Sequence, residues 1–217
     1  SVFCKMSMFT ISLNLLKKIL KRLHSKISTY CQYLYLWIDY KRYAYSLSSF
    51  RKVVKNLPPQ DKGSLLIVSG RGMNVMWAQV WSILSLAVRI HGYRGLVLTT
   101  HSQKHLNRYF KLLNLELIYY DDIAKKFPTT LPEELAKAVN MANSMYDYRN
   151  ILYNGARLGD IALSLYTRYH FTGIIDLNNQ GVIKFIKEWI NRLYQAMLIA
   201  EYIYKKYSVK HLFFTEF

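Results

Sequence analysis

The residues best placed to do chemistry surround a glycine-rich loop that directly follows an apolar run. Leu65 to Val68 are four apolar residues in a row, and Ser69, Gly70, Arg71 and Gly72 come next. A short run that is apolar throughout is typical of a strand buried on both faces of a parallel sheet. Glycines after such a strand let the main chain turn sharply, or let a ligand approach it closely. We therefore expect a binding cleft at this loop.

His101 and Glu216 also stand where predicted strands end. His101 directly follows the predicted strand 95–100, a position from which a general base could act. Glu216 lies near the end of the last predicted strand, 209–217, which we expect to be a central strand. In a parallel sheet it would share the carboxyl edge with the glycine loop. These two residues are the catalytic candidates, although a histidine in such a position is more often structural.

Two neighbouring carboxylates, Asp121 and Asp122, follow the predicted strand 115–120. Such a pair could hold a metal or act as a base. More often it caps the next turn, and this is the interpretation that we favour.

A stretch of small residues from Tyr153 to Asp160 carries one strong cation, Arg157, with Asn154 close to it. Arg157 could clamp an anionic group of a substrate. Equally, Gly155 and Gly159 could serve only to let two segments approach closely. The sequence favours neither interpretation.

The sequence contains no zinc-ligand spacing, no P-loop lysine and no serine nucleophile elbow. Its two cysteines, Cys4 and Cys31, are not spaced as metal ligands, so we expect free buried thiols in a reducing compartment. No metal site is predicted.

Alternating strands and helices must position these candidates. The predicted order is strand 64–68, helix 75–90, strand 95–100, helix 104–113, strand 115–120, helix 132–148, helix 161–169, helix 184–207 and strand 209–217. This order predicts an α/β fold with a Rossmann-like parallel sheet flanked by helices.

The sequence also predicts three details of the helices. In helix 75–90 the polar residues Gln79, Ser82, Ser85 and Arg89 are three or four apart, which predicts one narrow exposed stripe on an otherwise buried helix. Gly92 stands where a helix end favours a left-handed residue. Ser102 is the predicted N-cap of helix 104–113.

The first segment is a basic helical extension. Residues 8 to about 55 are predicted to be helical, and up to Lys62 there are 12 Lys and Arg against Asp39 and Asp61, a net charge of +10 out of +17. An apolar seam runs along it at helical spacing. Its members are Leu16, Ile19, Leu20, Leu23, Ile27, Cys31 and Leu34. Pro58 and Pro59 end the helix, which divides the chain into an extension (1–57), a linker (58–63) and a domain (64–217).

Three partners could explain the extension. Residues 8–45 could lie on an anionic membrane surface, or the helix could pack on its own domain with a solvated basic face; nucleic acid is the least favoured. No apolar run is long enough to span a bilayer, and no secretory signal is recognisable. We expect a cytoplasmic protein that can bind peripherally at the inner face of the cytoplasmic membrane.

Several features together resemble the N-terminal half of GT-B glycosyltransferases of bacterial capsule and surface-polysaccharide biosynthesis. The features are the strand into Ser69-Gly70-Arg71-Gly72 with Trp77 after it, the run His91 to Leu98, the segment Tyr153 to Gly159, and the last helix leading into Phe213 to Phe217. They span about residues 60 to 217, and their order is more specific than any one of them.

The resemblance implies two Rossmann-like domains across a cleft, of which this one shapes the site of a glycan or lipid-linked acceptor. The missing C-terminal domain would hold the nucleotide-sugar, the co-substrate, so this half would bind no cofactor and would be inactive alone. Most members need no bound metal, and in inverting members a carboxylate or histidine of this domain deprotonates the acceptor. If the family's pattern is carried over to this sequence, the cleft would be lined by Gly70, Arg71, Gly72 and Asn74, and Glu216 would lie across from them.

Two other hypotheses compete with this one. A non-catalytic basic α/β module could use the charge of +17 to bind nucleic acid or an anionic membrane surface. A small nucleotide-binding enzyme, complete in itself, would need an acidic residue for the ribose about 20 residues beyond the loop. None occurs between Leu86 and Leu98.

Overall fold

The computed structural model describes residues 21, 25–26, 28–32, 34–70 and 74–214. The chain divides into two compact units, Ser1–Asn56 and Leu57–Phe217. In the first unit the described residues up to 46 are helical, and the helix α2 (Phe50–Lys55) follows. Most of the predicted apolar seam lies outside the described residues. Two members that are described, Cys31 and Leu34, are exposed, so the prediction of a buried Cys31 thiol is wrong.

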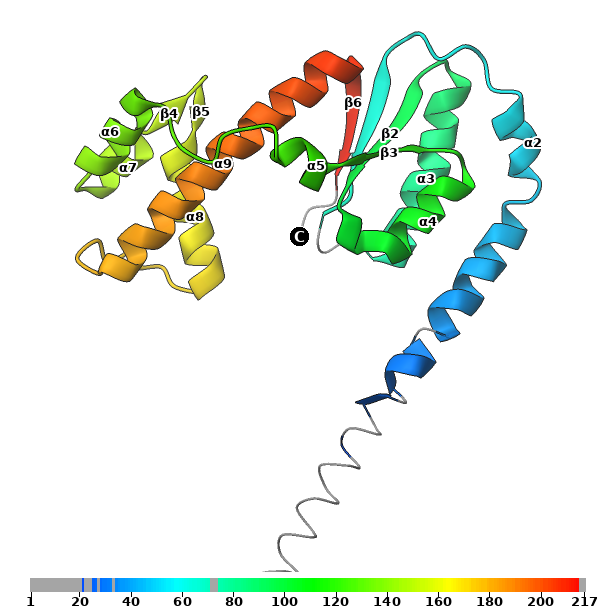
Figure 1. Ribbon diagram of the computed structural model, residues 1–217, viewed down its shortest axis with the longest axis horizontal. Coiled ribbons are helices and arrows are strands. Elements are labelled where there is room, and N and C mark those ends of the chain that lie inside the picture. The colour runs from blue at the N-terminus through cyan, green and yellow to red at the C-terminus, as the bar shows by residue number, and fades with distance from the viewer. Residues whose placement is uncertain (1–20, 22–24, 27, 33, 71–73, 215–217) are drawn as a thin grey trace, which may run out of the picture. The chain divides into compact units, whose positions relative to one another are not determined.

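The second unit is built on a four-stranded sheet in which all strands are parallel. Its strands are β1 (Ser64–Val68), β2 (Arg94–Thr99), β3 (Glu116–Tyr119) and β6 (Val209–Phe214), in the order β3-β2-β1-β6. Ile67 of β1 is paired with Val97 of β2 on one side and with Phe213 of β6 on the other. This confirms the predicted Rossmann-like α/β fold (Figure 1).

Helices cover both faces of the sheet (Figure 1). The helices α3 (Val75–Ile90) and α4 (Lys104–Leu112) lie on one face, and α5 (Tyr120–Ala124) and α9 (Gln180–Tyr207) lie on the other. Leu66, Leu96 and Ile118 pack against Ile199 and Ile203 of α9. Because the helix after β1 and the helix before β6 lie on opposite faces, the carboxyl ends of β1 and β6 form the switch point at which such sheets bind ligands.

The strand β6 lies at the edge of the sheet formed by the described residues, so the prediction of a central strand is wrong. It pairs only with β1 there, and its Lys210, His211 and Leu212 are exposed. The apolar run Leu212 to Phe214 misled the prediction because its apolar side chains are not all buried: Phe213 packs on Trp81 of α3, but Leu212 and Phe214 are exposed.

The helix α3 is oriented oppositely to the prediction. Ser82 and Ser85 are fully buried and Arg89 is 5% exposed, whereas Ile83 and Leu84 on the outer side are more than 40% exposed. The small hydroxyl side chains let the helix approach its neighbours closely, and each donates to a carbonyl of its own helix, Ser82 to Ala78 at 2.5 Å and Ser85 to Ser82 at 2.7 Å. The two buried serine hydroxyls of α3 therefore both have a hydrogen-bond partner.

The arginine of this buried stripe is satisfied only in part, because Arg89 Nε is buried without a hydrogen-bond partner. Arg89 Nη1 donates to the carbonyl of Leu113 after α4, and burial lowers the pKa of Arg89. The close packing continues at Gly95 of β2, where a β-carbon would lie 2.4 Å from Leu115 and 2.9 Å from Arg89. As predicted, Gly92 at the end of α3 has a positive φ of 89°.

A helical part surrounds the N-terminal half of α9 (Figure 1). It contains α6 (Glu133–Met141), α7 (Met145–Arg149), the hairpin of β4 (Leu152–Tyr153) and β5 (Ala156–Arg157), and α8 (Leu158–His170). The single helix predicted over 132–148 is wrong. Ser144 and Asp147 form a capping box that starts a new helix, with Ser144 Oγ 3.1 Å from the Asp147 amide nitrogen.

A glycine is needed at position 159 because the start of α8 lies very close to the end of α7. A β-carbon there would lie 1.7 Å from the Tyr148 carbonyl oxygen, so only glycine lets α8 begin against the end of α7. Gly155 has open space around it and a φ of +80°, as the turn between β4 and β5 requires. Gly159 thus serves packing, one of the two predicted alternatives.

Candidate functional site

The candidate site lies at the carboxyl edge of the sheet, where the segments after β1, β2 and β3 meet. Ser69 and Gly70 follow β1, a single 3₁₀ turn (His101–Gln103) follows β2, and α5 begins directly after β3. The predicted N-cap at Ser102 is wrong because this turn intervenes. Gln103 is the residue before α4, and the Ser102 hydroxyl lies 2.8 Å from the Thr100 hydroxyl.

Gln103 joins the loop after β1 to the loop after β2. Its Nε2 donates to the Gly70 carbonyl oxygen at 2.8 Å, and its Oε1 accepts from the Ser69 hydroxyl at 3.1 Å. The side chain is 8% exposed and Ser69 is 6% exposed. The main chain at the start of the glycine loop is therefore held by a buried amide that belongs to the neighbouring strand connection.

The network extends along the first turns of α4. The Thr99 hydroxyl lies 2.9 Å from Gln103 Oε1 and 2.7 Å from Asn107 Oδ1, and its single proton can be donated to one of them at a time. Asn107 Nδ2 donates to the Thr100 carbonyl oxygen at 3.2 Å. Thr99, Gln103 and Asn107 are four residues apart, so their spacing in the sequence could have revealed them, but our sequence analysis missed all three.

His101 is held by both carboxylates that follow β3. The His101 amide donates to Asp121 Oδ2 at 2.8 Å, and His101 Nε2 lies 2.9 Å from Asp122 Oδ2. The imidazole also stacks on the Tyr119 ring, with the ring centres 4.0 Å apart and the planes 10° from parallel. The aspartates thus position the histidine, which differs from the predicted capping of the next turn.

The electrostatics of the His101–Asp122 pair favour the ionised form of the Asp122 carboxyl group. The hydrogen bond from His101 lowers the pKa of Asp122, and Lys125, whose Nζ lies 3.4 Å from Asp122 Oδ1, acts in the same direction. Both side chains of the pair are 53% exposed, so the pair is accessible to a ligand from solvent.

This arrangement can perform general base chemistry. An ionised Asp122 accepts from His101 Nε2–H, and this tautomer leaves the lone pair on Nδ1. Stacking on Tyr119 fixes the plane of the ring, and the carboxylate stabilises the positive charge that forms when Nδ1 takes a proton. No group of acidic, histidine and cysteine side chains in the described ranges could hold a metal ion.

The other predicted site residues are dispersed. Asn74 is the N-cap of α3 and accepts from the Trp77 amide at 3.0 Å, while the Trp77 ring stacks on Trp81 along α3. Asn154 in the β4–β5 hairpin donates to Glu201 of α9 at 2.9 Å, and Arg157 is an exposed residue of β5. Arg71, Gly72 and Glu216 lie outside the described residues.

An apolar cavity of about 240 Å³ lies beside the site, between the sheet and α9. Val68 and Leu98 line it from the last part of β1 and β2, and Tyr120 lines it from the start of α5. On α9 the small side chains of Ala196 and Ala200 leave the space open. Tyr120, which lines the cavity, directly precedes Asp121, one of the two carboxylates that hold His101.

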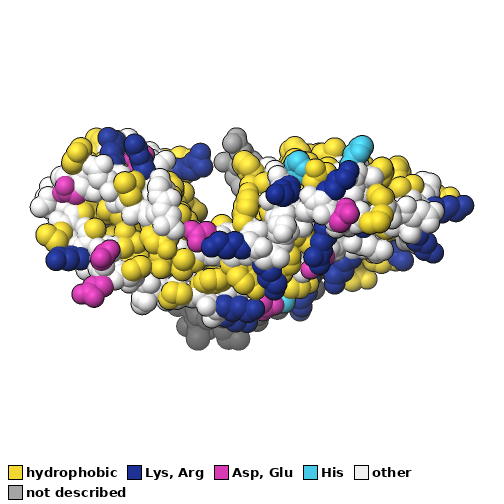
Figure 2. All heavy atoms as spheres, turned by 90° about the horizontal axis from the view of Figure 1, so that it is seen from above, with side chains coloured by type: hydrophobic (Ala, Val, Ile, Leu, Met, Phe, Trp, Pro, Cys, Tyr) yellow, Lys and Arg dark blue, Asp and Glu magenta, His cyan; other side chains and the backbone are white. Residues whose placement is uncertain are grey.

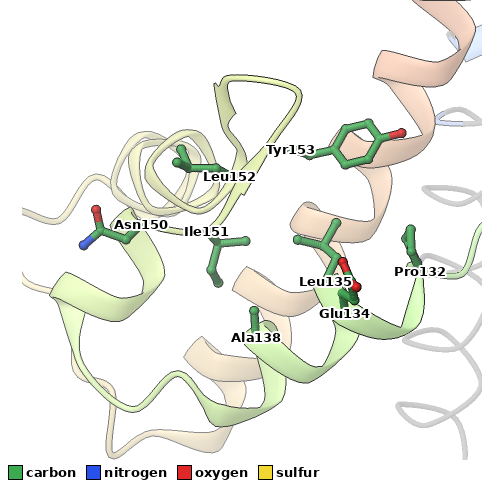
Figure 3. Close-up of a pocket in the computed structure, with 8 residues that line it drawn as sticks. All are labelled: Pro132, Glu134, Leu135, Ala138, Asn150, Ile151, Leu152 and Tyr153. Carbon is green, nitrogen blue, oxygen red and sulfur yellow. The ribbon is translucent and has the colours of Figure 1, made fainter.

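A second cavity, of about 310 Å³, lies in the helical part between α6 and the segment that enters the hairpin. Figure 3 shows Glu134 on α6 and Asn150 on the other side of the cavity, with Leu135, Ile151 and Leu152 between them. Its polar groups do not converge on one point, so the carboxyl edge of the sheet is the better candidate.

Comparisons with protein-family models, with curated proteins and with solved structures gave no match for this chain.

Proposed function

We propose that this chain is the acceptor-side domain of a glycosyltransferase in which His101 deprotonates the acceptor hydroxyl. The observation that carries the proposal is the His101–Asp122 pair, half exposed at the carboxyl edge of a parallel sheet with helices on both faces. Folds of this kind bind ligands beyond the carboxyl ends of their strands; the pair follows β2 and β3 at that edge, outside the switch point between β1 and β6. The resemblance of the chain to the N-terminal half of GT-B glycosyltransferases selects glycosyl transfer among the reactions that need a general base.

The proposed step is a displacement at the anomeric carbon of a nucleotide-sugar. The lone pair on His101 Nδ1 takes the proton of the acceptor hydroxyl, and the acceptor oxygen forms a bond to the anomeric carbon. The bond from that carbon to the terminal phosphate oxygen breaks, and the nucleoside diphosphate leaves with the electron pair. Asp122 stabilises the imidazolium until the proton passes to solvent.

The apolar cavity supports a lipid-linked acceptor. A glycan is polar throughout and would gain little from a cavity lined by Val68, Leu98 and Ala200. A lipid carrier would bury apolar surface there, at about 25 cal/mol for each Å². The nucleotide-sugar would be bound by a second domain, as in the two-domain enzymes that the chain resembles.

A non-catalytic basic module is the second candidate, and the distribution of charge bears on it. On the face shown in Figure 2, Lys and Arg side chains lie in separate groups among apolar side chains and do not form one continuous track. A nucleic acid backbone needs such a track. An anionic membrane surface does not need a continuous track, and this is the variant of the second candidate that the face in Figure 2 favours.

The test is an assay of nucleoside diphosphate release with the product of the whole gene, a panel of nucleotide-sugars and a lipid-linked acceptor. We expect His101→Ala to lower kcat by about 10²- to 10⁴-fold, as for removal of a general base. His170→Ala is the matched control, because His170 is an exposed histidine at the end of α8, in the helical part. Full activity of His101→Ala, or no transfer from any nucleotide-sugar, would refute the proposal.

A further inference from the structure

The outer side of α3 is a continuous apolar surface. At about 100° per residue, seven side chains fill an arc of about 140° on this helix, and all of them are apolar. They are Met76, Trp77, Val80, Ile83, Leu84, Ala87 and Ile90. Met76 is 55% exposed, Ile90 is 48% exposed, and Ile83 and Leu84 are 43% and 42% exposed. The hydrophilic side of the helix is the side that is buried.

An orientation of this kind is unfavourable in water unless something covers the apolar side. A surface helix normally turns its polar residues to the solvent. Here Ser82, Ser85 and Arg89 are buried instead, and hydrogen bonds satisfy the two hydroxyls and Arg89 Nη1. The exposed large apolar side chains of α3 mark an interaction surface, as contiguous apolar patches on soluble proteins do.

The neighbouring helix shows which partner fits. The helix α4 packs beside α3 on the same face of the sheet and carries Lys104, Arg108 and Lys111. Together the two helices have four Lys and Arg, counting the buried Arg89, and no Asp or Glu. An apolar surface that includes Trp77, next to a basic surface without acidic side chains, is the pattern of proteins that lie in the interface of an anionic bilayer.

We propose that the outer surface of α3 and α4 binds an anionic lipid bilayer, with α3 entering the headgroup boundary and the lysines of α4 contacting the lipid phosphates. A second copy of this chain is a poor occupant, because two such surfaces would bring like charges together on a chain that already carries +17. The inference does not depend on the proposed glycosyl transfer, since it rests on the other face of the sheet from the apolar cavity.

The first test places a fluorescent label on the surface. Ile83→Cys is introduced into the full chain with Cys4 and Cys31 replaced by serine, and labelled with an environment-sensitive fluorophore. Vesicles of phosphatidylcholine mixed with phosphatidylglycerol should shift its emission to the blue. The same label on Gly173→Cys, at an exposed loop position with no neighbouring atoms within 4 Å, should not respond. An unchanged spectrum at position 83 would overturn the proposal.

The second test separates the apolar and the charged contributions by vesicle sedimentation. We expect Ile83→Ser with Leu84→Ser to weaken binding about tenfold, which corresponds to about 1.4 kcal/mol. Lys104→Gln with Lys111→Gln should weaken binding at least tenfold on anionic vesicles and leave binding to phosphatidylcholine unchanged.

The control for charge is Lys184→Gln with Lys205→Gln, which removes two exposed lysines of α9, on the opposite side of the sheet from α3 and α4. Equal losses in both pairs would show that only the net charge matters and would refute a specific surface. Sedimentation equilibrium without lipid adds a further outcome. A dimer that Ile83→Ser with Leu84→Ser dissociates would assign the surface to a second copy and would also overturn the proposal.

Discussion

Gln103→Ala should loosen the glycine loop at a cost that can be worked out bond by bond. The substitution removes the hydrogen bond from Gln103 Nε2 to the Gly70 carbonyl and the one from the Ser69 hydroxyl to Gln103 Oε1. The Thr99 hydroxyl loses less, because it can donate to Asn107 Oδ1 instead. Two buried hydrogen bonds at about 0.5–1.5 kcal/mol each give an expected loss of about 2 kcal/mol in the free energy of unfolding.

For a chain of this length the melting temperature should fall by about 4–8 °C. The measurement is urea unfolding followed by tryptophan fluorescence, with hydrogen exchange at Ser69 and Gly70 as a local readout. Gln180→Ala is the matched control, because Gln180 is exposed at the first turn of α9, and it should change stability by less than about 0.5 kcal/mol. If the two variants are equally stable, the bridge between the loops does not exist as described.

A second substitution at the same position distinguishes the two ends of the amide. The carboxylate introduced by Gln103→Glu keeps an acceptor for Ser69 but turns an acceptor toward the Gly70 carbonyl. Protonation converts that oxygen into a donor, so the stability of Gln103→Glu relative to the natural protein should recover as the pH falls. A difference that stays constant with pH would contradict the assigned orientation of the amide.

Three further predictions concern other parts of the molecule. Gly159→Ala should destabilise the protein by about 1–3 kcal/mol, because its β-carbon would meet the Tyr148 carbonyl at 1.7 Å, whereas Gly173→Ala, with nothing within 4 Å, should be nearly neutral in the same urea titration. Ser144→Ala should cost about 1 kcal/mol through loss of the capping box at α7, and unchanged helicity and stability would argue against that cap. The carboxyl of Asp122 should titrate below 3.8, its ordinary value, in an NMR titration; its stabilising contribution is then present above that pH and is lost as the pH falls through the lowered pKa. In His101→Ala the midpoint should rise, because the hydrogen bond that lowers it is gone.

The sequence by itself determined the alternation of strands and helices and the places where the chain must turn. Apolar runs such as Leu65 to Val68 have no polar side to expose, so they predict strands covered on both faces, and the parallel sheet follows from the helices between them. Gly92 could be predicted because the end of a helix favours a left-handed residue, whereas the sequence left the role of Gly159 open.

Only the tertiary structure decided which side of α3 is buried. Periodicity separates two sides of a helix, but it assumes that the polar side faces water, and here the small hydroxyl residues were needed where backbones approach closely. The candidate site also depends on the tertiary structure. His101 meets Asp122 across 21 positions of the chain, and Gln103 reaches Gly70 across 33, distances over which local patterns carry no information. Those contacts exist because parallel strands bring their carboxyl ends to one edge, which is a property of the sheet and not of any single segment.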